Sequence, residues 1–160
     1  MSRDALFQLG MGSVQLKASQ KEENIIPLAS KTEASEPKDH FIHRGGVSFA
    51  GSHLIIDLFE AEQLDDIEHI EATMRQCVTE AGATLLHIHL HPFEPNGGIS
   101  GVAVLAESHI SIHSWPEKGY AALDVFMCGD AEPQRCVEVL RKAFKPKRIA
   151  VQELLRGRGA

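Results

Sequence analysis

The segment from Thr84 to His91 contains a strict alternation between two kinds of side chain. From residue 86 onward the even-numbered positions are aliphatic and the odd-numbered positions are imidazoles: Leu86, Ile88 and Leu90 alternate with His87, His89 and His91. Successive side chains of a β-strand point to opposite faces of a sheet, so this pattern predicts a strand with one apolar and one polar face. The apolar face needs a covering layer, and the histidine face needs solvent or a second subunit.

Two helical patterns predict that covering layer. Between Glu62 and Ala81 the apolar residues recur at the spacing of one helix face, and Gly82 follows where a C-terminal cap belongs. A second amphipathic helix is expected between residues 130 and 146. Further strands are expected at residues 53–59, 101–113, 120–127 and 148–154. Together these elements predict an α+β fold, a two-layer α/β sandwich in which a mostly antiparallel sheet of about five strands carries two helices on one face.

The first 46 residues differ in composition from the rest of the chain. Residues 18–40 are rich in Lys, Glu, Ser, Asn and Pro, and such a segment buries too little apolar surface to offset the entropy lost on ordering. We therefore expect residues 1–46 to form a disordered N-terminal extension and residues 47–160 to form one folded domain. A single domain agrees with the chain length of 160 residues.

Composition also limits which binding partners and which cellular compartment we expect for this chain. A net charge of -6 and a pI near 5.8 argue against nucleic acid or an anionic membrane as the main partner. No apolar run is long enough to span a membrane, and the N-terminus lacks the layout of a signal peptide, so we expect a cytoplasmic protein. The three cysteines form no CxxC pair, which disfavours a disulfide framework and a cysteine-rich zinc site.

Polar chemistry is concentrated between Glu107 and Glu117, which hold three serines and two histidines between them. One interpretation is a serine hydrolase that uses Ser108 or Ser111 with a nearby histidine and Asp124. The Gly-x-Ser-x-Gly elbow of such enzymes is absent, and no segment identifies an oxyanion hole. The sequence therefore disfavours a hydrolase.

Two other features carry alternative interpretations. The histidines at positions 87, 89 and 91 suggest a zinc site completed by His109 or His113, but they span about 13 Å along a strand and cannot all share one ion. We expect no metal. Cys128 ends an apolar strand close to the start of the second predicted helix, where a helix dipole would lower the pKa of its thiol. On the residues alone, Cys128 is equally well explained as a buried structural cysteine.

Several separated motifs share the pattern of one known family. They are Gly98-Ile99-Ser100-Gly101, Glu107-Ser108-His109, the runs 112–117 and 119–126, and Cys128-Gly129-Asp130. In residue type and spacing these motifs strongly resemble the prokaryotic S-adenosylmethionine decarboxylase proenzymes, which are pyruvoyl-dependent. The resemblance covers about residues 51–158 and leaves the N-terminal extension outside it.

The resemblance implies that the chain cleaves itself between Glu107 and Ser108. The Ser108 Oγ would attack the Glu107 carbonyl and convert the amide into an ester, and loss of the Ser108 α-proton would then expel the Glu107 carboxylate. The dehydroalanine left at position 108 would hydrolyse to a pyruvoyl group, the cofactor, and release ammonia. The products would be a β chain that ends at residue 107 and an α chain that begins at residue 108.

The same resemblance assigns roles to further residues. His113 matches the histidine that takes the proton during elimination, and Ser100 matches a hydroxyl that assists the rearrangement. Cys128 matches the donor that returns a proton to the substrate α-carbon during turnover. Glu117 is similar to the residue that holds the ribose hydroxyls, and Phe93 and Trp115 are candidates for contacts to adenine or the sulfonium.

The implied activity is decarboxylation of S-adenosylmethionine, a small-molecule substrate, to the aminopropyl donor for spermidine synthesis. An arginine or ornithine decarboxylase on the same scaffold is an alternative, because the processing residues do not specify the substrate. A non-catalytic or metal-binding dimeric domain is the rival of another class. We expect a dimer of αβ units, since the resemblance implies sites built across a dimer interface.

One geometric difficulty arises from the sequence alone. In an unbroken strand, Ser108 and His113 have opposite parity and point to opposite faces of the sheet. A bulge, a strand end at the cleavage point, or movement after cleavage would reconcile the two positions.

Overall fold

A computed structural model of the protein describes residues 41–160. The first described elements are two short strands, β1 (Ile42–Arg44) and β2 (Val47–Phe49), which pair antiparallel as a separate two-stranded sheet. Strand β1 lies on the N-terminal side of the boundary expected at residue 47. The predictions made for residues 1–40 lie outside the described residues.

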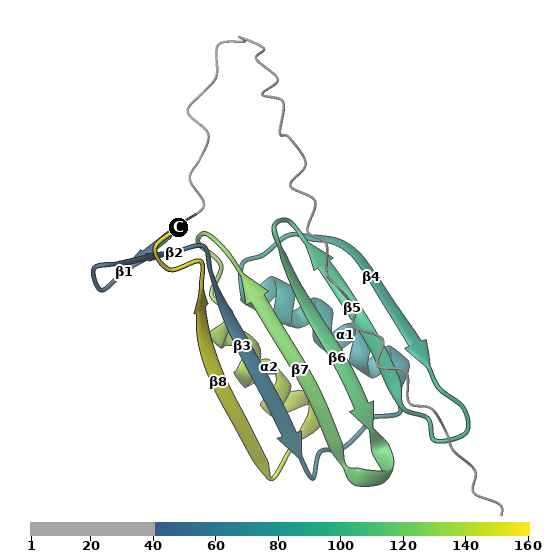
Figure 1. Ribbon diagram of the computed structural model, residues 1–160. Coiled ribbons are helices and arrows are strands. Elements are labelled where there is room, and N and C mark those ends of the chain that lie inside the picture. Colours follow the sequence, from purple (N-terminus) through teal and green to yellow (C-terminus); the bar gives the residue numbers. More distant parts are fainter. Residues whose placement is uncertain (1–40) are drawn as a thin grey trace, which may run out of the picture. The chain divides into compact units, whose positions relative to one another are not determined.

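The main sheet has six strands, and each pair of neighbours runs antiparallel (Figure 1). Their order across the sheet is β4-β5-β6-β7-β3-β8. The strands are β3 (Gly51–Phe59), β4 (Leu85–Pro92), β5 (Ile99–Leu105), β6 (Ser108–Trp115), β7 (Tyr120–Met127) and β8 (Arg148–Arg156). Strand β3 thus lies between two strands from the C-terminal part of the chain.

Both helices, α1 (Ile67–Glu80) and α2 (Gln134–Phe144), cover the same face of this sheet (Figure 1). The Asp66 carboxylate caps α1 by accepting a hydrogen bond from the backbone N–H of His69 at 3.0 Å. The predicted apolar faces are the buried ones: Ile70, Met74, Cys77 and Val78 on α1, and Cys136, Val139 and Leu140 on α2. They pack on alternate residues of the strands, such as Leu54, Ile56, Ile110, Ile112, Leu123 and Val125. Among residues 41–160, this packing leaves the opposite face of the sheet without helices; we call it the helix-free face.

The α+β sandwich is confirmed, with six strands in the main sheet where about five were expected. Residues 101–113 were expected to form one strand, whereas the chain turns back at Ala106 and Glu107 and makes β5 and β6. The alternation expected for β4 is also interrupted, because the register shifts between Leu85 and His87 and leaves Leu86 64% exposed. In the part of the chain that the structure describes, no helix is long and apolar enough to cross a membrane.

Candidate active site

The predicted cleavage point lies at the tip of the β5–β6 hairpin. Leu105 and Ser108 are the last paired residues, so Ala106 and Glu107 form a two-residue turn. Glu107 has a φ of 62°, in the left-handed region that disfavours residues with a side chain by about 1–2 kcal/mol. The bond after Glu107 therefore follows a backbone conformation that is uncommon for residues other than glycine.

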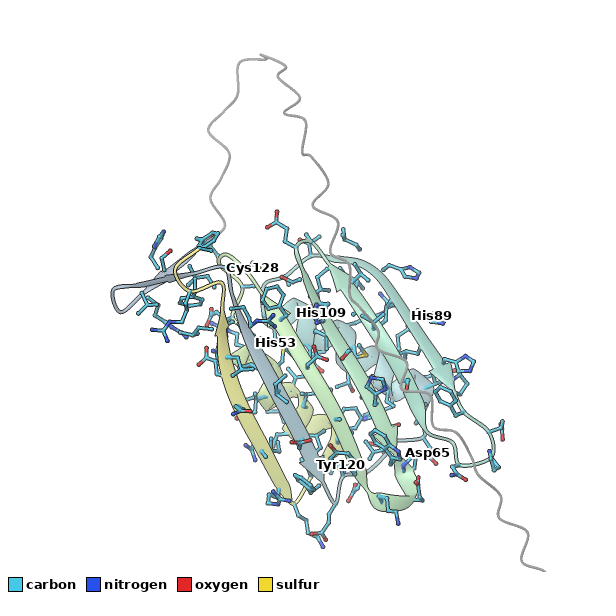
Figure 2. The ribbon with its side chains drawn as sticks, in the orientation of Figure 1. His53, Asp65, His89, His109, Tyr120 and Cys128 are labelled. Carbon is cyan, nitrogen blue, oxygen red and sulfur yellow. The ribbon has the colours of Figure 1, made fainter. Side chains whose placement is uncertain are left out.

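Cys128 contacts both sides of this bond from the end of β7. Its backbone N–H donates a hydrogen bond to the Ser108 Oγ at 3.3 Å, and its thiol donates to the Glu107 carbonyl oxygen at 3.4 Å. A donor on the carbonyl oxygen polarises the carbon that Ser108 would attack. Figure 2 shows Cys128 at the end of the sheet where this hairpin tip lies.

The environment of Cys128 differs from the one expected. Helix α2 begins only at Gln134, so the thiol does not lie at its N-terminus. Instead, burial raises the pKa of the Cys128 thiol above its ordinary value, and the negative charge of Glu107 raises it further. The expectation of an acid-shifted thiol is wrong, and Cys128 is held in the neutral, protonated form, which is the form that can donate a proton.

The other predicted site residues line a cavity of about 250 Å³, which we call the second cavity because it is distinct from the cavity at the cleavage point. Its lining includes Phe93, Ser100, His113, Trp115 and Glu117. Ser100 and His113 are direct partners across β5 and β6, and the Ser100 Oγ lies 2.8 Å from the His113 Nδ1. The structure therefore brings together these five residues, which come from a loop, two strands and the short 3₁₀ helix η1 (Pro116–Lys118).

The Trp115 ring in the second cavity is held in place by contact with Tyr120. It stacks on Tyr120, with ring centroids 5.3 Å apart, and the Tyr120 hydroxyl donates to the Asp57 carboxylate at 2.6 Å. The hydrogen bond to Asp57, helped by partial burial, raises the pKa of Tyr120, so that hydroxyl stays protonated. Figure 2 shows Tyr120 at the end of the sheet opposite Cys128. Stacking on Tyr120 fixes the plane of the indole.

The structure does not bring Ser108 and His113 together within one chain. Both belong to β6, which is unbroken, and five residues of strand separate them by about 17 Å. They also keep the opposite parity that the sequence indicated, with His113 exposed on the helix-free face. The predicted residues thus form two groups: a cleavage group of Glu107, Ser108 and Cys128, and a cavity group of Phe93, Ser100, His113, Trp115 and Glu117.

A polar network on the helix-free face includes Ser111 and Asp124, which the sequence suggested only as part of the disfavoured hydrolase site. Asp124 of β7 lies between two histidines, and its Oδ1 is 2.9 Å from Nε2 of His53 and 2.9 Å from Nε2 of His109. The Ser111 hydroxyl donates to the other carboxylate oxygen, and Arg156 lies 3.1 Å from Nδ1 of His53. We call these five residues the Asp124 network. Figure 2 shows His53 and His109 on neighbouring parts of this face.

The Asp124 network borders a cavity of about 520 Å³ that reaches the cleavage point. Its lining includes His53, His109 and Arg156 together with Glu107 and Ser108. Burial alone would raise the pKa of Asp124, but the hydrogen bonds from Ser111, His109 and His53 outweigh burial, and the pKa lies below its ordinary value. Asp124 is therefore a carboxylate near neutral pH.

The same cluster has the spacing of a metal site, because the ligand atoms of His53, His109 and Asp124 lie within 4.8 Å of one another. Its hydrogen bonds do not suit one. A metal-bound imidazole binds through the lone pair of one nitrogen and carries its proton on the other. Arg156 can only donate, so Nδ1 of His53 must be unprotonated and the proton must lie on Nε2, the atom that a metal would need.

Sequence reasoning missed this network because it depends on strand register. In the sheet, Asp124 is opposite Ile55 on one side and Ser111 on the other, which brings His53 and His109 to its two sides. The available signal was a titratable side chain in each of three predicted strands: His53, His109 and Asp124. Arg156 was missed because the last strand was expected to end at residue 154, whereas β8 continues to Arg156.

Comparison with known proteins agrees with these motifs. Residues 52–157 match the family described as S-adenosylmethionine decarboxylase. The S-adenosylmethionine decarboxylase proenzyme of Thermomicrobium roseum is 44% identical over 108 residues, which cover 67% of this chain and 93% of that one. The proenzyme of the same name from Thermotoga maritima is 47% identical over 111 residues, covering 68% and 85%. The crystal structure of the adenosylmethionine decarboxylase from Aquifex aeolicus matches with a TM-score of 0.62 and 36% identity, covering 68% of this chain and 92% of that chain. The chain therefore belongs to the S-adenosylmethionine decarboxylase family.

Proposed function

We propose that this protein is a self-processing, pyruvoyl-dependent decarboxylase of S-adenosylmethionine. One observation carries the proposal: Cys128 donates hydrogen bonds to both the Ser108 Oγ and the Glu107 carbonyl oxygen, in a member of a family whose relatives are named proenzymes. The turn at the hairpin tip presents this peptide bond outside the paired strands, so it can be cut without breaking the sheet.

The residues present fit the formation of a pyruvoyl group from Ser108. The Ser108 Oγ attacks the Glu107 carbonyl carbon, and the Cys128 thiol stabilises the oxygen as negative charge develops. The C–N bond of the amide then breaks, the nitrogen takes the hydroxyl proton, and an ester joins the two residues. A base then removes the α-proton of residue 108, the Glu107 carboxylate leaves, and hydrolysis releases ammonia. The pyruvoyl group supplies a ketone for the substrate amine and an adjacent amide carbonyl as an electron sink.

The other predicted residues bind the substrate and move protons. Cys128 donates a proton to the substrate α-carbon after carbon dioxide has left, a role that its raised pKa supports. In the second cavity, Glu117 binds the ribose hydroxyls, while Phe93 and Trp115 offer aromatic faces to adenine or to the sulfonium. His113, hydrogen-bonded to Ser100, is the base of the elimination.

Separation of the two groups supports a dimer whose two sites each combine both chains. The cavity group of one copy would meet the cleavage group of the other, because His113 and Ser108 of one chain are about 17 Å apart along β6. Apolar side chains on the helix-free face are also exposed, with Val104 at 41%, Trp115 at 42% and Leu154 at 42%. A partner that covers this face would remove them from water.

The substrate is tested by supplying carboxyl-labelled S-adenosylmethionine, arginine and ornithine in parallel to the processed protein. We expect labelled carbon dioxide from S-adenosylmethionine alone, since the second cavity offers aromatic rings and a carboxylate suited to a nucleoside. The same protein, boiled before the assay, is the control for spontaneous decay. Carbon dioxide from arginine or ornithine, with none from S-adenosylmethionine, would contradict the proposed substrate.

The proton-donor role of Cys128 predicts a pH dependence. A donor must be protonated, and because the pKa of Cys128 is raised, its contribution is complete below that pKa and is lost as the pH rises through it. We expect the alkaline fall of kcat to lie above about pH 8.5, the ordinary thiol pKa. In Cys128→Ala, kcat should fall by about 10²- to 10⁴-fold, the usual contribution of a general acid. Stopped-time decarboxylation assays across pH measure both effects.

Cleavage itself should survive in Cys128→Ala, because the lost thiol hydrogen bond is worth about 1 kcal/mol and slows processing by less than about tenfold. Cys136→Ala is a matched cysteine control, because that thiol is buried beneath the helices, away from the cleavage point. Normal turnover by the cleaved Cys128→Ala protein would exclude the donor role.

A further inference from the structure

We propose that His109 is a further catalytic residue, the base that removes a proton from the α-ammonium group of the substrate. The inference rests on the proposed pyruvoyl-dependent reaction, because an amine must lose a proton before its nitrogen can attack a ketone. None of the roles assigned to His113, Ser100 or Cys128 supplies this base. The position, hydrogen bonds and charge of His109 support the assignment.

Position is the first support. The backbone nitrogen of His109 is bonded directly to the carbonyl carbon of residue 108, so its imidazole is attached a few bonds from the group made from Ser108. His109 also lines the cavity of about 520 Å³ together with Glu107 and Ser108. A substrate amine that reaches residue 108 through this cavity therefore enters beside the imidazole.

Hydrogen bonding is the second support, because it fixes which nitrogen can accept a proton. The pKa of Asp124 is lowered, so its carboxylate can only accept, and Nε2 of both neighbouring histidines must donate to it. His53 is then used at both nitrogens, since Arg156 donates to its Nδ1. Within residues 41–160, Nδ1 of His109 has no hydrogen-bond partner. Of the two imidazoles, His109 is the one with a basic nitrogen left to act.

Charge is the third support, because the imidazolium that forms needs a counterion. The proton transfer breaks one N–H bond of the ammonium; the electron pair stays on the substrate nitrogen, and the proton binds Nδ1 of His109. The Asp124 carboxylate, from β7, holds the opposite nitrogen and stabilises the positive charge. The other titratable groups near His109 are His53 from β3, Arg156 from β8 beyond His53, and Glu107 from the turn.

The variant His109→Gln distinguishes a role of His109 as a base from a role as a structural hydrogen-bond partner of Asp124. The glutamine amide nitrogen reaches about where Nε2 lies and can still donate to Asp124, but it cannot take a proton. We expect cleavage into two chains to proceed and kcat/KM near pH 7 to fall by about 100-fold, the lower range for a general base. The deficit should shrink as the pH rises, because the substrate then arrives as the free amine. His43→Gln, on the exposed strand β1, is the matched control and should leave kcat/KM unchanged.

A second measurement does not depend on turnover. In ¹⁵N-labelled Ser108→Ala protein, which keeps the intact chain, imidazole ¹⁵N shifts report which nitrogen of each histidine carries the proton. We expect the neutral His109 ring to be protonated at Nε2 and unprotonated at Nδ1. Adding Asp124→Asn should remove this preference, since an amide can also donate.

The outcomes distinguish this inference from the proposed function. A wild-type protein that never cleaves would defeat the pyruvoyl proposal itself. Cleaved His109→Gln with wild-type kcat/KM, or with a deficit that stays constant with pH, would overturn the role of His109 alone. An uncleaved His109→Gln chain would assign the residue to processing and overturn the inference too, as would a neutral His109 ring protonated at Nδ1.

Discussion

Replacing Ser108 with alanine is expected to leave one intact chain of 160 residues without decarboxylase activity. The substitution removes both the nucleophile of cleavage and the atoms that become the ketone, so at least about 10⁶-fold of the rate should be lost, the smallest acceleration typical of enzymes. The fold should persist, because the Ser108 Oγ accepts one hydrogen bond of 3.3 Å, and losing it costs about 1 kcal/mol. Denaturing mass spectrometry and release of labelled carbon dioxide measure the two effects.

The matched control is Ser48→Ala, an exposed serine on β2. It should cleave and turn over as the wild-type protein does. Two fragments from Ser108→Ala, divided between positions 107 and 108, would show that the serine hydroxyl is not the nucleophile. A wild-type chain that stays whole after folding and incubation would rule out self-processing.

Mixing two inactive variants should restore activity if each site combines two chains. In a dimer of Ser108→Ala with His113→Ala, one site contains both substitutions and the other contains neither. Random pairing in a twofold-symmetric dimer makes half of the dimers mixed, so about one quarter of the wild-type activity should return. Each variant alone should be inactive. The measurement is decarboxylation by the co-expressed variants, with distinct tags to show that only the His113→Ala chain is cleaved.

Pairing Ser108→Ala with Cys128→Ala provides the control. Ser108 and Cys128 belong to the same cleavage group, so every site in the mixed dimer contains one substitution. Activity should therefore remain below the level reached by the pair of Ser108→Ala with His113→Ala. Absence of activity with both pairs, in mixtures shown by tag capture to contain mixed dimers, would mean that His113 acts on Ser108 of its own chain.

The regular parts of the fold could be predicted because their signals are local. The apolar spacing that buries Ile70, Met74 and Cys77 on α1 is visible in the sequence, and it requires no knowledge of what the helix contacts. The alternation of β4 predicted a strand correctly but placed Leu86 with the apolar set, since a register shift is decided by the pairing with β5.

The break between β5 and β6 could not be predicted for a different reason. Two-residue hairpin turns favour Gly, Asn or Asp, whereas this one is Ala106-Glu107. Ordinary turn chemistry therefore gives no sign of a turn, and the residue that adopts the left-handed conformation is the glutamate that precedes the proposed cleavage point. Local preference fails at the position where we propose that the chain does chemistry, which is where such conflicts are expected.

The candidate residues themselves were identified from motifs, but their arrangement was not. Ser100 and His113 meet because β5 and β6 pair in a register that puts them opposite each other. The division of the predicted residues into a cleavage group and a cavity group likewise depends on the length of β6. The Asp124 network required the positions of β3, β6, β7 and β8 at once.

The order of strands would hold the two fragments of the proposed cleavage together in one sheet. Strand β3 precedes the cleavage point, yet it pairs with β7 and β8, which follow it, and β5 pairs with β6 across the cut. The two fragments would therefore be interleaved within one sheet and could separate only by global unfolding. Before cleavage, the sheet forms within one continuous chain, which is a unimolecular step; after cleavage, the fragments would have to find each other from solution, without the high effective concentration that a continuous chain provides. With the proposed cleavage, the chain would have to fold before it is cut, and the cleaved protein would refold more slowly at lower protein concentration.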